Sequence, residues 1–152
     1  MTFAQKIKTV MGLAPVATDA NPLSAWVDLS QAIRCKVVVA VTKGNAALTS
    51  FTLRESTDGV GAGAGVQNVS NNVQVYSNLD TSASETLVRR ANAVTYALDD
   101  ADGGEGQVVV FDVDPAKLAI NDGYRYLAVQ LAAGNAANIA SITYELDLRE
   151  TE

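Results

Sequence analysis

The fold is decided by the stretch from Gln107 to Arg149. It contains Gln107-Val-Val-Val-Phe-Asp-Val-Asp-Pro115, a bridge to Asn121-Asp-Gly123, Tyr124-Arg-Tyr-Leu-Ala-Val-Gln-Leu131 and, after Gly134-Asn135, the run Ile139–Leu148. The last run alternates apolar and polar residues: Ile142, Tyr144, Leu146 and Leu148 against Ser141, Thr143, Glu145 and Asp147. A period of two places the apolar set on one face of a sheet. These runs predict an antiparallel sheet with one dry face.

The middle run of this stretch shows the same pattern. Leu127, Val129 and Leu131 share one face, and the opposite face carries Tyr124, Tyr126, Ala128 and Gln130. Asp122-Gly123 and Gly134-Asn135 predict turns at its two ends, because Gly and Asn accept positive φ at low cost.

The remainder of the chain adds further strand-like runs at residues 23–29, 35–42, 48–56, 73–76, 86–90 and 94–98. About eight such runs with regularly spaced turns predict an all-β fold, an antiparallel β-sandwich or jelly roll. The Lys43-Gly-Asn45 turn predicts that residues 35–42 and 48–56 form a hairpin. A length of 152 residues favours one domain.

The N-terminal residues 1–21 are predicted to form an extended arm, followed by a sandwich domain of residues 22–152. Phe3, Ile7, Val10 and Met11 fall on one face of a short helix, which Gly12 and Pro15 would end. Such a helix is marginal alone, so it would dock on a neighbouring subunit or a partner. The alternative is a frayed tail or one turn packed on its own domain.

Two Gly-rich or acidic segments invite a ligand interpretation. Residues 58–72 have the composition of a flexible loop, and Gly61-x-Gly63-x-Gly65 lacks the helix and the Lys-Ser/Thr that a phosphate loop needs. Residues 99–106 form an acidic turn whose spacing fails the calcium-loop pattern, so a solvated turn is favoured. Asp112, Asp114 and Asp122 are a further possible carboxylate cluster.

The charge balance argues against nucleic-acid and membrane partners. The chain has 11 basic and 17 acidic residues, a net charge of −6, which opposes phosphate binding. No run reaches the 18 apolar residues of a membrane span, and the signal-like stretch near the N-terminus is interrupted by Gly12 and Pro15, so we treat it as part of the working protein. Charged residues are only 18% of the chain, which favours a surface partly covered by a partner.

The residue inventory predicts that the protein is not an enzyme. The chain has no His and a single Cys, which excludes Ser-His-Asp and Cys-His catalysis and imidazole zinc sites. Cys35 is expected to be a buried small hydrophobe, and no disulfide is implied. Carboxylate chemistry remains open, but nothing brings an acidic pair into a dry cleft. We therefore expect no catalytic residue, cofactor or metal.

Several segments together resemble a known family. They are Asp114-Pro-x-x-Leu118, Asp122-Gly-Tyr-x-Tyr-Leu-x-Val129, the small-residue loop, the final alternating strand, and Phe51-Thr-Leu-Arg-Glu-Ser-Thr-Asp-Gly59. This combination resembles head decoration, or cement, proteins of tailed bacteriophages. The resemblance implies a sandwich or jelly roll that binds the outer surface of the major capsid lattice, located in the virion at the capsid surface. It also implies a homo-oligomer, a trimer.

The predicted contact residues are Phe3, Ile7, Met11 and Leu13 in the arm, followed by Gly61, Gly63 and Gly65 in the loop. Two alternatives stay open. One is a carbohydrate-binding sandwich module that uses exposed aromatic residues, with Trp26, Tyr76, Tyr124 and Tyr126 as candidates. The other is a structural component of a phage tail or head–tail connector.

Overall fold

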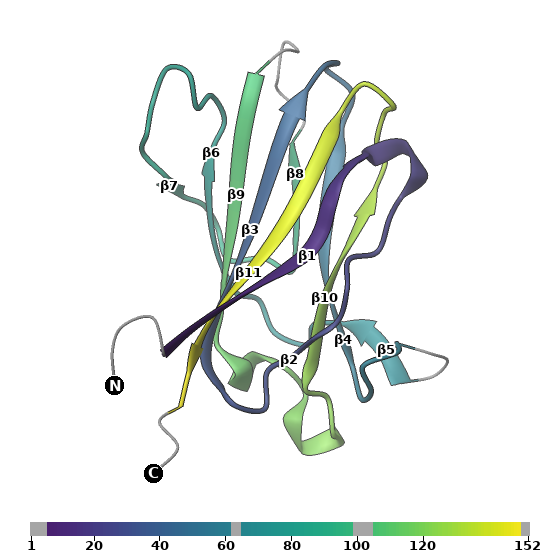
Figure 1. Cartoon of the computed structure of the whole chain (residues 1–152), viewed down its shortest axis with the longest axis vertical. Coiled ribbons are helices and arrows are strands. Elements are labelled where there is room, and N and C mark those ends of the chain that lie inside the picture. The colour runs from purple at the N-terminus through teal and green to yellow at the C-terminus, as the bar shows by residue number, and fades with distance from the viewer. Residues whose placement is uncertain (1–5, 62–64, 99–104, 150–152) are drawn as a thin grey trace.

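The computed structural model describes residues 6–61, 65–98 and 105–149 of the chain. Two antiparallel sheets pack face to face (Figure 1). The six-stranded sheet runs, in spatial order, β1 Ile7–Ala17, β11 Ile139–Leu148, β3 Ala32–Lys43, β9 Glu105–Val113, β6 Gln74–Asn78 and β7 Val88–Arg89. The five-stranded sheet runs β2 Val27–Asp28, β10 Tyr126–Ala132, β4 Thr49–Ser56 and β5 Val66–Asn68, with β8 Thr95–Leu98 also paired to β4. Short 3-10 helices are η1 Thr18–Ala20, η3 Pro115–Lys117 and η4 Ile120–Asp122.

The core lies between the sheets and follows the predicted alternation. The inward side chains of three neighbouring strands of the six-stranded sheet are fully or almost fully buried: Val37, Val39 and Val41 of β3, Val109, Phe111 and Val113 of β9, and Ile142, Tyr144 and Leu146 of β11. Leu127, Val129 and Leu131 of β10 face them from the other sheet. The prediction of an all-β sandwich is confirmed. Among the described residues, no helix is long and apolar enough to cross a membrane.

The predicted hairpin of residues 35–42 and 48–56 is wrong. β3 and β4 lie in different sheets, so the chain crosses the sandwich between them. The ammonium group of Lys43 is fully buried at this crossing and donates to the carbonyl oxygens of Ala47 and Leu98. The crossing lets both strands direct an apolar face to one core, which a two-stranded hairpin alone cannot do.

The stretch 107–149 is likewise divided between the sheets. β9 and β11 flank β3 in the six-stranded sheet, whereas β10 belongs to the five-stranded one. The chain therefore crosses the sandwich twice, before and after β10, which gives the fold its jelly-roll-like character. The predicted turn at Gly123 has φ +86°, but at the second turn the positive φ falls on Ala133, and Gly134 instead allows close approach to Thr18.

The predicted N-terminal helix is wrong for the described residues. β1 is an edge strand that pairs with β11, so residues 7–17 belong to the sandwich. Val10 and Leu13 pack against the core, while Met11 points outward and is 68% exposed. The helical spacing of the apolar residues does not decide the structure here. A short isolated helix is marginal in stability, whereas pairing with β11 gives the backbone N–H and C=O groups hydrogen-bond partners and buries alternate side chains. Residues 1–5 lie outside the described residues.

The segment predicted as a flexible loop is mostly ordered by specific contacts. β5 pairs with β4, and Val69 is buried. The fully buried Glu55 carboxylate accepts hydrogen bonds from Gln67 Nε2 at 2.7 Å, from Ser70 Oγ at 2.6 Å and from the Ala119 backbone N–H at 3.0 Å. A buried carboxylate requires such hydrogen bonds. Here they also connect residues 65–70 to the chain around η3. Residues 62–64 lie outside the described residues.

Candidate binding groove on the six-stranded sheet

The outward side chains of the six-stranded sheet form rows that the strand register defines. In the first row Lys36 lies between Glu145 and Asp112, and Asp112 lies opposite Gln74. In the second row Val38 lies between Thr143 and Val110, and Val110 lies opposite Tyr76. In the third row Ala40, Val108 and Asn78 follow one another. A charged row is thus followed by two rows whose members on β3 and β9 are apolar.

These rows line an open groove of about 590 Å³, which we call the sheet groove. Its lining residues are Lys36, Val38, Tyr76, Leu87, Val108, Val110, Asp112 and Glu145. Three valines form the floor, and Leu87, which is 43% exposed, comes from the segment before β7. Beyond Val108 the hollow continues to Thr81, Ser84 and Glu85. The result is an apolar channel beside a row of charged side chains.

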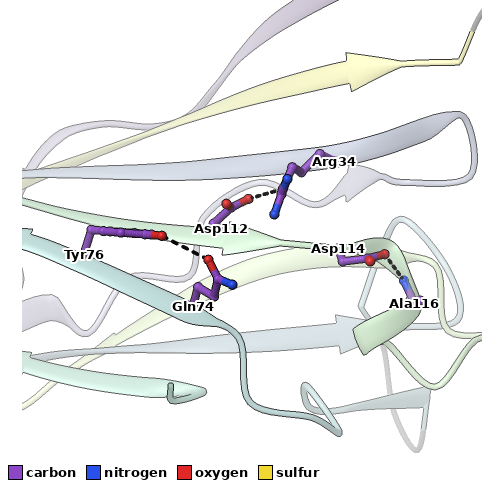
Figure 2. Close-up of polar contacts among 6 residues, drawn as sticks. All are labelled: Arg34, Gln74, Tyr76, Asp112, Asp114 and Ala116. Atoms are coloured by element: carbon purple, nitrogen blue, oxygen red, sulfur yellow. Dashed lines mark hydrogen bonds and ion pairs between the residues drawn. The ribbon is translucent and has the colours of Figure 1, made fainter. Parts of the chain in front are cut away.

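The charged row is held by an ion pair at its β3–β9 junction. Arg34 Nε lies 2.6 Å from Asp112 Oδ1, with the Asp112 side chain 15% exposed and the Arg34 side chain 53% exposed (Figure 2). Exposure of the guanidinium limits the contribution of such a pair to stability. Its main consequence is to fix the Asp112 carboxylate at the end of the groove.

Cys35 lies on the other side of β3 and is fully buried, as predicted. Burial, and secondarily the nearby Asp112 carboxylate, raises the pKa of the Cys35 thiol to about 12. The group therefore stays a neutral thiol at physiological pH, which is the behaviour of a core residue and unsuited to nucleophilic chemistry.

Tyr76 is positioned in the groove by β6. Its hydroxyl donates to Gln74 Oε1 at 3.0 Å, a bond between residues on the same strand face (Figure 2). The other aromatic candidates lie elsewhere: Tyr126 belongs to β10 of the five-stranded sheet, and Gly61 packs closely on the Trp26 indole. Tyr124 immediately precedes β10. The four aromatic residues therefore do not form one flat surface.

The possible carboxylate cluster does not assemble. Asp112 pairs with Arg34, whereas Asp114 accepts a hydrogen bond from the Ala116 backbone N–H at 2.9 Å and caps η3 (Figure 2). Asp122 lies in η4. Within residues 6–61, 65–98 and 105–149, no group of three or more His, Cys, Asp or Glu is placed to hold a metal ion. The acidic turn at residues 99–104 lies outside the described residues.

The predicted contact residues are separated by the fold. Ile7 and Met11 lie in register with Asp147 and Thr143, on the same face as the sheet groove, whereas Leu13 packs toward the core. Gly61 and Gly65 belong to the segment beyond β4: Gly61 has φ +66° and contacts Trp26, and Gly65 lies against Thr57. Phe3 and Gly63 lie outside the described residues.

Sequence reasoning missed the valines of the groove floor. Val38 lies within Val37-Val-Val39, and Val108 and Val110 lie within Val108-Val-Val110, so no polar residue marks the outward positions. The available signal was the apolar character of both faces in two runs of an antiparallel protein. In such a sheet an outward valine on a central strand is unusual and points to a covered surface.

Comparisons with known proteins identify no family. No family model matches the chain, and no curated protein matches it either. Among solved structures, the SPBc2 prophage-derived protein YomS is similar at TM-score 0.47 and 4% identity, over 92% of this chain and 91% of that one.

Two further similar structures are of proteins whose names refer to sugars. The Clostridium thermocellum xylanase 10B fragment with its CBM22-1 and GH10 modules gives TM-score 0.35 and 10% identity, over 97% of this chain and 25% of that one. A putative sugar binding protein from Bacteroides thetaiotaomicron gives TM-score 0.33 and 13% identity, over 91% and 82%. At such scores these likenesses carry no argument about function.

Proposed function

We propose that this chain is a head decoration protein of a tailed bacteriophage, which binds the outer surface of the major capsid lattice and stabilises the head without catalysing a reaction. The observation that carries the proposal is the sheet groove, whose floor of Val38, Val108 and Val110 faces outward instead of toward the core. Apolar surface of this kind is what a protein interface covers. The sequence resemblance of residues 51–59 and 114–148 supplies the identity of the partner.

The proposed mechanism is stabilisation by binding. A protein that binds the assembled lattice, but not the dissociated one, shifts the equilibrium toward the assembled state by mass action. A net charge of −6 favours approach to basic patches on the capsid, and a homotrimer would multiply the contact made by each protomer. The location is then the capsid surface.

The direct test uses purified heads of the phage that encodes the chain, stripped of this protein. We expect the wild-type chain to co-sediment with heads to a saturable stoichiometry and to raise the temperature at which the heads release DNA. Chain that stays in the supernatant at all concentrations would contradict the proposal. Parallel sedimentation with purified tails and connectors tests the alternative location.

One observation favours a carbohydrate-binding role as the second candidate. Tyr76 lies in the sheet groove close to Gln74 and to the charged row of Lys36 and Asp112, and an aromatic ring beside polar side chains suits a sugar. Glycan-array binding that is lost in Tyr76→Ala, together with no sedimentation on heads, would favour this candidate over the first.

A further inference from the structure

We propose that the sheet groove binds an extended polypeptide segment of the partner, with the pattern apolar-x-apolar-x-basic. This inference rests on the proposed function only in that the partner is a capsid protein. It names the part of the partner that is bound and the residues of this chain that bind it.

The spacing of the rows selects an extended segment. The row of Val38, Val110 and Tyr76 and the row of Ala40 and Val108 are two residues apart along β3 and β9. At about 3.3 Å per residue, this separation is about 7 Å, and alternate side chains of an extended peptide have the same repeat. A segment that runs along β9 therefore places two alternate side chains over the two apolar rows.

One side of the groove has an apolar wall. Leu87 and Tyr76 stand on one side of the floor, so apolar side chains of the segment would be enclosed by the valines, the Tyr76 ring and the Leu87 side chain. Enclosure of this kind is typical of the few contacts that dominate binding energy. The intervening side chains of the segment would point to solvent, which leaves their identity open.

Charge complementarity defines the third position of the pattern. The lining residues of the groove and its continuation include three carboxylates, Glu85, Asp112 and Glu145, and one ammonium, Lys36. Arg34 pairs with Asp112, and Arg89 lies opposite Tyr76 on β7, so the charges around the groove balance and the position of Glu85 sets the local charge. Glu85 stands beyond the apolar rows, at the end of the groove away from Lys36. A Lys or Arg two residues after the second apolar side chain would lie near Glu85.

The test measures binding of a fluorescein-labelled peptide, Ser-Leu-Thr-Leu-Thr-Arg-Ser, to the full chain by fluorescence anisotropy. Control peptides replace both Leu by Ser, or Arg by Glu. We expect saturable binding that weakens about tenfold or more in Leu87→Ser and in Val110→Lys, as loss of a central apolar contact does. Glu85→Lys should weaken binding of the Arg peptide and strengthen binding of the Glu peptide.

Ile120→Ser is the matched control, since Ile120 is 55% exposed on η4 and does not line the groove. Circular dichroism checks that each variant is folded. If Val110→Lys does not fold, the exposed Leu87→Ser variant still tests the inference. Equal binding by wild type and folded groove variants, or no saturable binding of any peptide, would overturn the inference. If the peptide does not bind but the wild-type chain still sediments with heads, the inference fails and the proposed function stands. If the peptide binds but the chain does not sediment with heads, the proposed function fails and the inference stands.

Discussion

The outer faces of the two sheets are built on the same alternation but carry different side chains. On the five-stranded sheet, Thr52 lies between Gln130 and Thr95, and the Thr52 and Thr95 hydroxyls are 2.9 Å apart. Gln130 Nε2 donates to the Asn21 carbonyl oxygen at 2.7 Å. On the six-stranded sheet, the corresponding central position is Val38, which lies between Thr143 and Val110.

This difference distinguishes side chains that the fold requires from side chains that are free to serve binding. Both inner faces are mainly apolar because the core requires it, and on the outer five-stranded face Thr52, Thr95 and Gln130 bind one another or the backbone. The outer six-stranded face combines the half-buried Val38 and Val108 and the exposed Leu87 and Met11 with a row of charges, a composition that folding does not require. We therefore propose that the binding role belongs to that face, and we expect the other face to be neutral toward partners.

The largest predicted effect contrasts two neighbours on β9 that point to opposite sides. Phe111 is fully buried in the core, so Phe111→Ala should lower the free energy of unfolding by about 3–5 kcal/mol. Val110 faces the groove, and Val110→Ala should lower it by less than about 1.5 kcal/mol. Urea denaturation followed by tryptophan fluorescence measures both. Similar losses would show that the groove floor is part of the core.

Alkaline pH should destabilise the inner face through buried groups that resist ionisation. Burial raises the pKa of Cys35 from 9.0 to about 12 and also raises the pKa of Tyr144, whose hydroxyl contacts Ser24 Oγ at 2.6 Å. The unfolded thiol loses its proton above pH 9, while the native thiol keeps it. The free energy of unfolding should therefore fall as pH rises, by about 2–3 kcal/mol between pH 9 and 11 from Cys35.

Cys35→Ala is the control for this prediction. Denaturation curves at pH 9, 10 and 11 should show a shallower pH dependence in the variant than in the wild type. Equal slopes would mean that the thiol contributes nothing to the alkaline loss. Below pH 9 the two proteins should differ only by a constant free energy, because the thiol is then protonated in both states.

The smallest effects are expected for polar groups on the two outer faces. Asp112→Asn removes the ion pair with the exposed Arg34 guanidinium, and Thr52→Val removes a hydroxyl pair on the opposite sheet. Each should change the free energy of unfolding by about 1 kcal/mol or less, because water can replace an exposed partner. Thermal denaturation compares them, and a loss above 2 kcal/mol in either would assign that side chain a structural role.

The sequence predicts the class of fold but leaves the partners of each strand open. Alternation states which residues of a strand are buried, and it does so correctly for Ile142, Tyr144 and Leu146. Alternation does not show to which sheet the strand belongs. The turn residues do not show it either, because Lys43-Gly-Asn45 is compatible both with a hairpin and with a crossing to the other sheet. The apolar residues of β1 are ambiguous for a similar reason, because Ile7 and Met11 share a face in a helix and in a strand.

The groove was beyond sequence reasoning for two physical reasons. Its floor lies in runs of consecutive valines, in which apolar and polar residues do not alternate, so the pattern does not show which valines point outward. Its walls also come from distant segments, since Tyr76 is paired with Val110 and Leu87 enters from the segment before β7. Only the strand register brings these residues together.

The most direct test of the central claim compares one lysine on each outer face. Val38→Lys and Thr52→Lys both alter outward, half-buried positions near the middle of a paired strand. We predict that Val38→Lys weakens sedimentation of the folded protein on stripped heads by about tenfold or more, whereas Thr52→Lys binds within about twofold of wild type. Equal binding by the two variants, or a greater loss in Thr52→Lys, would contradict the assignment of the binding role to the six-stranded sheet.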